Sequence, residues 1–334
     1  MSDAPDSPQA AISDLELLER SGEAATRLRA EVGKVVVGQT DVLEGMLIAL
    51  AAGGHALLVG VPGLAKTLLV SSLAQALDLS FGRVQFTPDL LPADITGTDV
   101  LHEQDGARSL RFLPGPIFHN LVLADEINRT PPKTQAALLQ AMQEREVTVG
   151  TQTHPLPDPF QVFATRNPIE QEGTYPLPEA QRDRFLLEIM VDYPSEEQER
   201  EVALRTTSAR MPELSPVVSH DELRGIIRLV PRIPVTDEAV KLAVSLTRAT
   251  RPGWPTAPKE VTEYVRYGAG PRGSQGLVLA AKARAALRGE AAADVDDLRS
   301  LVVPTLRHRL VLSYRAEADG VTEVDVLDRV RAAV

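Results

Sequence analysis

The sequence predicts an α/β domain built on a doubly wound, five-stranded parallel sheet, followed by a smaller, all-helical domain. Up to Pro194, short apolar runs alternate with helical segments, which is typical of strands that helices cover on both faces. After Pro194 the apolar spacing is almost wholly helical. A length of 334 residues with 43% hydrophobic residues fits about two globular domains. We expect an acidic N-terminal tail at 1–22, the α/β domain at 23–208 and the helical domain at 209–334.

Each expected strand is a short apolar run, and each expected helix has apolar residues at helical spacing. The expected strands are 55–60, 84–86, 121–124, 160–164 and 186–191. The expected helices of the first domain are 23–37, 40–52, 66–77 and 131–144, the last with a proline at its start, where proline is tolerated. The expected helices beyond Pro194 are 196–208, 219–230, 236–250, 274–288, 294–303 and 323–333.

Composition and charge exclude several classes of function. The chain has no cysteine, which excludes a disulfide framework, a thiol nucleophile and a cysteine-built zinc site. A net charge of −11 argues against a direct nucleic-acid partner, which usually requires a basic surface. The acidic start lacks the basic and apolar regions of a signal peptide. Gly53 and Gly54 split the most apolar stretch, so we expect no transmembrane segment and a cytoplasmic protein.

A glycine-rich loop lies between the first expected strand and its helix. Backbone N–H groups of such a loop cradle phosphates, and the helix N-terminus adds its positive dipole end. The lysine would reach the β- and γ-phosphates, and the threonine would hold Mg²⁺. The usual pattern has glycine immediately before the lysine, where this chain has alanine. The residues expected to contact ATP are Gly60, Val61, Pro62, Gly63, Leu64, Ala65, Lys66, Thr67 and Leu68.

Two acids end the strand at 121–124. Ligands of parallel sheets bind at the carboxyl ends of the strands. Asp125 is therefore expected to join Thr67 in holding Mg²⁺, and Glu126 to polarise the attacking water. On its own, an acidic pair after a strand is usually a solvated strand end, but the phosphate loop makes the functional interpretation stronger.

Further polar residues follow at strand ends and at a helix start. Asn167 ends the next strand and would touch the γ-phosphate or the water, although an asparagine before proline is also a common turn former. Arg182 and Arg184 precede the last strand, where an arginine can stabilise the transferring phosphoryl group, often from a neighbouring subunit. Arg272 precedes a helix of the second domain and would close over the phosphates.

These elements, in this order, resemble the AAA+ ATPases, whose core is a P-loop NTPase fold. Longer segments are more specific and resemble the MoxR family: Phe112-Leu-Pro-Gly-Pro-Ile-Phe118, Ala124-Asp-Glu-Ile-Asn-Arg129, Pro132-Lys-Thr-Gln-Ala-Ala-Leu138 and Tyr175-Pro-Leu-Pro-Glu-Ala180. The resemblance covers roughly residues 25–330. The alanine before the lysine looks typical of that family.

The resemblance implies a role for each candidate residue. It implies that Lys66 and Thr67 are the Walker A residues, Asp125 and Glu126 the Walker B residues, and Asn167 sensor 1. It implies that Arg184 is the arginine finger and Arg272 sensor 2. Arg182 stands where an apolar residue is expected, so either arginine could be the finger, and Arg184 is favoured. The family also carries insertions, expected here at 86–112 and 145–160, both at a ring's central opening unless they are packing loops.

The resemblance further implies an ATP-driven, chaperone-like remodelling or maturation factor that forms a homo-oligomer, expected to be a hexameric ring. Family members often act with proteins that bear a von Willebrand factor A domain, so such a partner is expected here. The alternatives are the ATPase subunit of a metal chelatase, a DNA-associated motor, which the charge disfavours, and a nucleotide-gated scaffold without turnover. The intact acidic pair argues against the scaffold.

Overall fold

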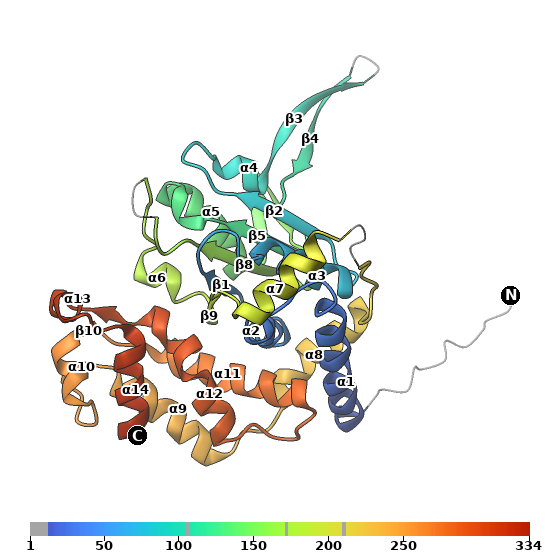
Figure 1. Cartoon of the computed structure of the whole chain (residues 1–334). Helices are drawn as coiled ribbons and strands as arrows, with labels where there is room; N and C mark the ends of the chain where they lie inside the picture. The colour runs from blue at the N-terminus through green and yellow to red at the C-terminus, as the bar shows by residue number, and fades with distance from the viewer. Residues whose placement is uncertain (1–12, 105–106, 171–172, 209–211) are drawn as a thin grey trace, which may run out of the picture.

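The computed structural model describes residues 13–104, 107–170, 173–208 and 212–334. A parallel sheet lies at the centre, most of the helices beyond residue 212 pack below it, and a long hairpin projects above it (Figure 1). The strands are β1 (Ala56–Val59), β2 (Phe81–Gln85), β3 (Gly97–Gln104), β4 (Ala107–Pro114), β5 (Leu121–Asp125), β6 (Glu146–Val149), β7 (Gln152–Pro155), β8 (Gln161–Arg166), β9 (Leu187–Met190), β10 (Val265–Tyr267) and β11 (Val311–Leu312).

The helices fall into two groups along the chain. Those before residue 209 are α1 (Asp14–Val32), α2 (Thr40–Ala51), α3 (Lys66–Ala76), α4 (Pro92–Thr96), the 3₁₀ turn η1 (Ile127–Arg129), α5 (Pro132–Glu144), α6 (Glu179–Arg182) and α7 (Glu196–Thr206). Those after residue 211 are α8 (His220–Leu229), η2 (Val230–Arg232), α9 (Asp237–Ala249), α10 (Lys259–Tyr264), α11 (Pro271–Arg288), α12 (Val295–Leu306), η3 (Arg307–Arg309), α13 (Tyr314–Asp319) and α14 (Glu323–Ala333).

The central sheet has five parallel strands in the order β2-β5-β8-β1-β9. This confirms the predicted doubly wound α/β fold. β2 begins three residues earlier than predicted, at Phe81, because its exposed positions alternate with buried ones and Arg83 hides the apolar pattern. The register pairs Ala56 of β1 with Phe163 of β8 and Leu187 of β9, so the strand starts are aligned along one edge.

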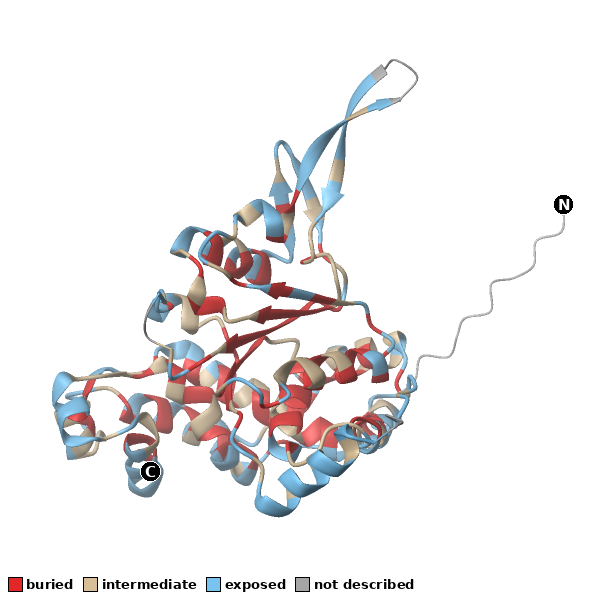
Figure 2. Ribbon diagram, turned by 45° about the horizontal axis from the view of Figure 1, so that its top comes forward, coloured by how far each residue is buried: buried red, intermediate tan, exposed pale blue. Residues whose placement is uncertain are grey.

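Each face of the sheet packs into its own hydrophobic core. Leu57 of β1 contributes to a core that includes Leu138 of α5. Its neighbour Leu58 points to the other face, where the core runs through α2 and α3 into Leu277 of α11. Figure 2 shows the buried sheet between these layers. The second helical group therefore shares a continuous core with one face of the sheet.

The chain beyond residue 211 is mainly helical, as predicted, but it also contains a small sheet. Antiparallel strands β10 and β11 pair Val265 with Leu312. The prediction of an all-helical second part lacked this sheet, because strands this short carry too few residues to display a period-2 pattern. The predicted boundary between the domains, at 208 and 209, adjoins residues 209–211, which lie outside the described residues.

The N-terminal tail was predicted to extend to residue 22, and that prediction is wrong for residues 14–22, which belong to α1. Ser13 caps the helix by accepting a hydrogen bond from the backbone of Glu16 (3.2 Å). Acidic residues in the first turn favour a helix start because they oppose its positive dipole end. Buried Leu18 and Ala25 anchor the helix. Residues 1–12 of the predicted tail lie outside the described residues.

The two expected insertions are built around hairpins at one end of the molecule. The first contains α4 and the β3–β4 hairpin that projects in Figure 1, apart from residues 105 and 106, which are not described. The second contains the β6–β7 hairpin, as its alternation predicts. The rings of Phe112 and His154 stack between the insertions with centroids 3.9 Å apart.

Among the helices of the described residues, none is both long enough and apolar enough to cross a bilayer.

Candidate nucleotide-binding site

The glycine-rich loop connects the carboxyl end of β1 to the start of α3, which begins at Lys66. Gly63 has a φ of 85°, in the left-handed region that glycine adopts without strain. Ala65 also has a positive φ, 57°, which explains why glycine is usual at this position. Alanine adopts this conformation at a cost of about 1 kcal/mol, so the departure from the usual motif is compatible with the same loop shape.

The Lys66 side chain folds over this loop. Its ammonium donates hydrogen bonds to the carbonyls of Gly60 (2.5 Å) and Val61 (2.9 Å). Burial lowers the pKa of Lys66, and the carboxylates of Asp125 and Glu126 partly offset that shift. The loop thus holds a cation within a cleft of about 440 Å³, which Pro62, Leu64, Thr67 and Leu68 also line.

Asp125 ends β5 and faces the same cleft. The hydroxyl of Thr165 donates a hydrogen bond to its Oδ1 (2.6 Å). The guanidinium of Arg83, from the neighbouring strand β2, lies 2.7 Å from its Oδ2. Both oxygens of the carboxylate are therefore partnered, one by a neutral donor and one by a cation.

Glu126 follows directly and adopts a left-handed conformation, with a φ of 57°. This turn is held in place because its backbone N–H donates to the hydroxyl of Thr165 (2.8 Å). Its Oε2 accepts hydrogen bonds from Gln85 (2.8 Å) and Arg129 (2.9 Å). The contact with Glu126 raises the pKa of Arg129. A non-glycine residue held in the left-handed backbone region is a common feature of functional sites.

Asn167 follows β8 and lines the same cleft. It is only 4% exposed. Its Oδ1 accepts a hydrogen bond from the backbone of Ile169 (3.2 Å), which is the turn-forming contact that its position before proline predicts. Its Nδ2 has no hydrogen-bond partner among the described residues. A buried amide donor without a partner is costly, and it is available for an oxygen of a bound group.

The residues around the loop fit a magnesium ion that binds together with phosphates. The described residues contain no group of three or more His, Cys, Asp or Glu side chains that could hold a metal by themselves. Mg²⁺ commonly uses only one or two protein oxygens and takes its remaining ligands from phosphates and water. Thr67 and Asp125 in the one cleft match that requirement.

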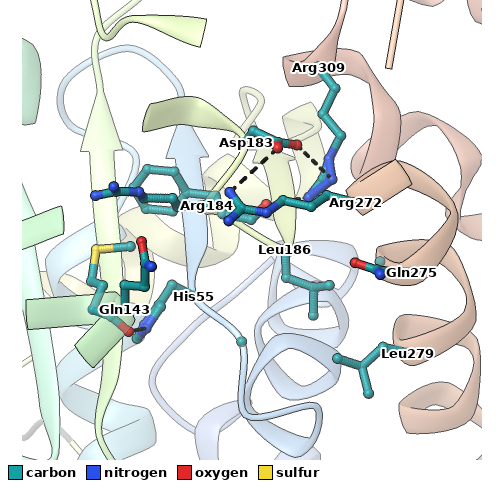
Figure 3. Close-up of a pocket in the computed structure, with 13 residues that line it drawn as sticks. His55, Gln143, Asp183, Arg184, Leu186, Arg272, Gln275, Leu279 and Arg309 are labelled. Carbon is teal, nitrogen blue, oxygen red and sulfur yellow. Dashed lines mark hydrogen bonds and ion pairs between the residues drawn. The ribbon is translucent and has the colours of Figure 1, made fainter. Parts of the chain in front are cut away.

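Arg184 and Arg272 do not line this cleft; they line a second pocket of about 270 Å³ (Figure 3). Arg184 precedes β9, and this pocket also contains Gly54 and His55, which precede β1. Because β1 and β9 are parallel, the second pocket lies at the amino edge of the sheet, whereas the glycine-rich loop lies at the carboxyl edge. The two edges are roughly 13 Å apart for a four-residue strand.

Asp183 connects the two parts of the chain that build this second pocket. Its carboxylate lies 3.6 Å from Arg272 at the start of α11 and 3.4 Å from Arg309 of η3. Three arginines but only one carboxylate line the pocket, and the Arg184 side chain extends away from Asp183 (Figure 3), so an acidic protein carries a local excess of positive charge here. An anionic group is the expected ligand of such a pocket.

Arg182, the alternative to Arg184, has different surroundings. It lies near the buried side chains of Glu188 and His308. Burial is the largest influence on both, and it raises the pKa of Glu188 and lowers the pKa of His308. The positive charge of Arg182 is a smaller influence that lowers both pKa values. Arg182 is absent from the residues that line the second pocket. Of the two arginines, only Arg184 therefore lines the positively charged pocket.

The sequence did not single out several residues of the two sites. Gln85 and Arg83 lie on an edge strand and look like exposed strand residues, and Thr165 is an ordinary strand residue. Their importance comes from pairing, because β2, β5 and β8 are adjacent in the sheet but distant in sequence. Arg309 of η3 lines the second pocket, and its neighbour His308 contacts Phe185 of the pocket wall. Both positions result from the packing of the helical part against the sheet.

Two family profiles match the chain. Residues 55–187 match the ATPase family associated with various cellular activities (AAA), and residues 258–330 match the AAA lid domain. A crystal structure from Cytophaga hutchinsonii, described as a candidate ATPase, superposes with a TM-score of 0.89 at 40% identity. It covers 96% of each chain. The fold and the two-part organisation are therefore those of an AAA ATPase.

Curated relatives identify the family more closely. Chaperone MoxR1 of Mycobacterium tuberculosis is 44% identical over 304 residues, which are 91% of this chain and 80% of that protein. Protein MoxR of Paracoccus denitrificans is 34% identical over 318 residues, which cover 90% of this chain and 91% of that protein. This protein is therefore an ATPase that belongs to the MoxR family of AAA ATPases.

Proposed function

We propose that the protein hydrolyses Mg-ATP at a site shared between neighbouring subunits of a ring, and that it uses this energy to remodel or mature a partner protein. The observation that carries the shared site is the separation of the two sets of residues. The phosphate loop lies at one edge of the sheet, while Arg184 and Arg272 lie together at the other. Arg184 directly precedes β9, so a subunit cannot bring it to its own phosphates without breaking the β1–β9 pairing.

Within one subunit, the cleft residues bind and orient ATP. Lys66 leaves the carbonyls of Gly60 and Val61 and neutralises phosphate charge. Thr67 and Asp125 would hold Mg²⁺ through their side-chain oxygens, and Arg83, which lies 2.7 Å from Oδ2 of Asp125, would compete with the metal for that carboxylate. The metal, when bound, would neutralise charge on the β- and γ-phosphates.

Glu126 orients the attacking water and accepts its proton. Gln85 and Arg129 both bind its Oε2, and no described hydrogen bond involves its Oε1. This oxygen is the one available to water. Asn167 offers its unpartnered amide to the γ-phosphate or to the same water. The neighbouring subunit supplies Arg184, and with it Arg272, so that charge on the transferring group is stabilised only after assembly.

The remodelling role rests on family and on the projecting hairpin. The family includes a relative described as a chaperone. Leu101, Leu110 and Leu113 of the β3–β4 hairpin are all more than half exposed, and Leu110 is 71% exposed. Exposed apolar side chains on a projecting arm are suited to contact another protein. We propose a hexameric ring and a partner with a von Willebrand factor A domain, as the resemblance implies.

Mixed assemblies test the shared site. Arg184→Ala should bind ATP normally but lose turnover by about 10³-fold, the lower end of the effect of an arginine finger. Lys66→Ala should bind no nucleotide but keep an intact finger. Mixing the two variants, each inactive alone, should restore turnover. If the mixture stays inactive while both variants assemble, the shared site is wrong.

Turnover per subunit against protein concentration tests assembly independently, with Glu126→Gln as the control for contaminating activity. A steep rise followed by saturation is expected for a shared site. A constant, nonzero specific activity down to concentrations at which sizing shows monomers would contradict it. Binding of ATP without turnover at every concentration, with or without the partner protein, would favour the nucleotide-gated scaffold instead.

A further inference from the structure

The short turn η3 of the lid holds the chain segment that carries Arg184. Arg309 donates from its Nη2 to the carbonyl of Phe185 (2.7 Å). His308 donates from its Nε2 to the same carbonyl (3.0 Å). The Nη1 of Arg309 lies 3.4 Å from Asp183 Oδ1. Two consecutive residues of the lid therefore bind the residues on both sides of Arg184, and Figure 3 shows the ion pair between Arg309 and Asp183.

The same turn makes a third contact one step further along the chain. Arg307 lies with its Nε 3.2 Å from Oε1 of Glu188, which is 5% exposed and lies in β9. On the other side of the segment, the backbone N–H of Leu186 donates to the carbonyl of His55 (2.8 Å). The segment from Asp183 to Glu188 is thus fixed between the sheet and η3. Of its charged side chains that line the pocket, Asp183 and Arg184, only Arg184 has no ion pair among the described residues.

Burial makes Arg309 an unusual choice for a packing residue. Its side chain is 4% exposed, and its Nε and Nη1 have no hydrogen-bond partner within the described part of the chain. Burial lowers its pKa to about 10. An apolar side chain of similar volume usually stabilises such a position at least as well, because it avoids the desolvation of a charge. What the guanidinium adds is direction, since its fork can hold a carboxylate and a carbonyl in one fixed arrangement.

We propose that Arg309 is a positioning residue that sets the orientation of Arg184 and makes it depend on the position of the lid. This inference rests on the proposed role of Arg184 as the arginine that completes a neighbour's site. Arg309 is not among the residues that line the cleft of the glycine-rich loop. It acts through Asp183 and Phe185. A shift of the lid, which packs on the sheet, would therefore change the orientation in which Arg184 faces the next subunit.

The first test measures the segment itself and needs no ATP turnover. In Arg309→Gln, the backbone amides of residues 183–186 should exchange hydrogen for deuterium faster than in the wild type, whereas those of the phosphate loop should be unchanged. Arg299→Gln is the matched control, because Arg299 is an exposed arginine on the adjoining helix α12. Unchanged exchange at 183–186 would overturn the proposal, whatever the role of Arg184.

The second test separates positioning from general damage. Arg309→Gln should lower kcat by about tenfold or more, as expected when a charge-stabilising group is displaced, while the affinity for a fluorescent ATP analogue stays within about twofold. Arg309→Lys keeps the charge but cannot make both contacts, so its kcat should lie between those of the wild type and Arg309→Gln. A wild-type kcat in Arg309→Gln would overturn the proposal.

Mixed assemblies distinguish this inference from the proposed function. Lys66→Ala subunits, which have intact η3 turns, should restore turnover in Arg309→Gln subunits, just as they restore it in Arg184→Ala subunits. If they rescue Arg184→Ala but not Arg309→Gln, then Arg309 acts on its own subunit and the positioning role is wrong. If they rescue neither, the shared site is wrong, and the exchange experiment then decides alone whether η3 fixes the segment.

Discussion

The two edges of the central sheet differ in how their residues are gathered. At the carboxyl edge, the glycine-rich loop and the pair Asp125–Glu126 each follow a strand within a few residues. At the amino edge, the pocket joins Arg184, Arg272 and Arg309 from three separate parts of the chain. The first set is gathered by local backbone geometry, whereas the second depends on how the lid packs on the sheet. The motif-based set can therefore be recognised from the sequence, whereas the set built by packing becomes visible only in the folded chain.

The largest effect is expected from a substitution at the carboxyl edge of the sheet. Glu126→Gln should lower turnover by about 10²–10⁴-fold, the range for loss of a general base, and leave ATP binding intact. Unlike Arg184→Ala, it should not recover when mixed with Lys66→Ala subunits, because Glu126 serves the nucleotide of its own subunit. Single-turnover experiments measure the loss of hydrolysis, and a nucleotide-binding assay measures whether the affinity for ATP is kept. Recovery in the mixture would place Glu126 in the shared set and contradict this assignment.

The next effect concerns His55, which lies at the amino edge. Its Nδ1 accepts from the backbone of Val162 (3.0 Å), its Nε2 lies 3.1 Å from the carbonyl of Met142, and burial lowers its pKa to about 4. Between about pH 6.5 and 4, the unfolded chain therefore binds a proton that the folded chain does not. The free energy of unfolding should consequently decrease as the pH is lowered through this interval. The expected loss is roughly 2 kcal/mol between pH 7 and pH 5.

Urea unfolding of the wild type and His55→Gln at both pH values measures this effect. The variant should lose about 2 kcal/mol less than the wild type over that interval. Buried His308 also has a lowered pKa, so the variant should keep part of the pH dependence. Equal losses in the two proteins would mean that His55 does not stay neutral in the folded state.

A smaller effect is expected at Arg272. Its side chain is about half exposed, and its Nη1 lies 3.6 Å from Asp183, so solvent weakens its interactions. Arg272→Gln should lower turnover by about tenfold, the lower end for loss of a charged hydrogen bond. Lys66→Ala subunits should restore it if Arg272 acts across the interface with Arg184. Loss of ATP affinity in Arg272→Gln, without rescue, would indicate that the arginine serves its own subunit.

The smallest effect is expected from a substitution in the phosphate loop. Ala65→Gly should change the free energy of unfolding by no more than about 1 kcal/mol, because relief of the positive φ and the greater flexibility of unfolded glycine oppose each other. Turnover should stay within about twofold of the wild type. A large loss of activity would show that the methyl group of Ala65 has a role in the cleft beyond loop geometry.

The sequence by itself determined the features whose causes are local. Apolar runs predicted the five strands of the sheet, and the glycine-rich loop stands between β1 and α3 as its motif predicts. The hairpin at 146–155 follows from alternation and a glycine turn. The acids near Ser13 were interpreted as a tail although they begin α1, because the same acids favour both a solvated segment and a helix start.

Only the tertiary structure decided which distant residues meet. Gln85 reaches Glu126 because β2 and β5 are neighbours in the sheet, although they are about forty positions apart in the sequence. Arg272 reaches Asp183 rather than the phosphate loop because the lid packs at the amino edge of the sheet. Arg309 becomes significant only once η3 is placed against Phe185. Strand order and the docking of helices arise from packing of the whole chain, and local residue patterns do not encode these long-range contacts.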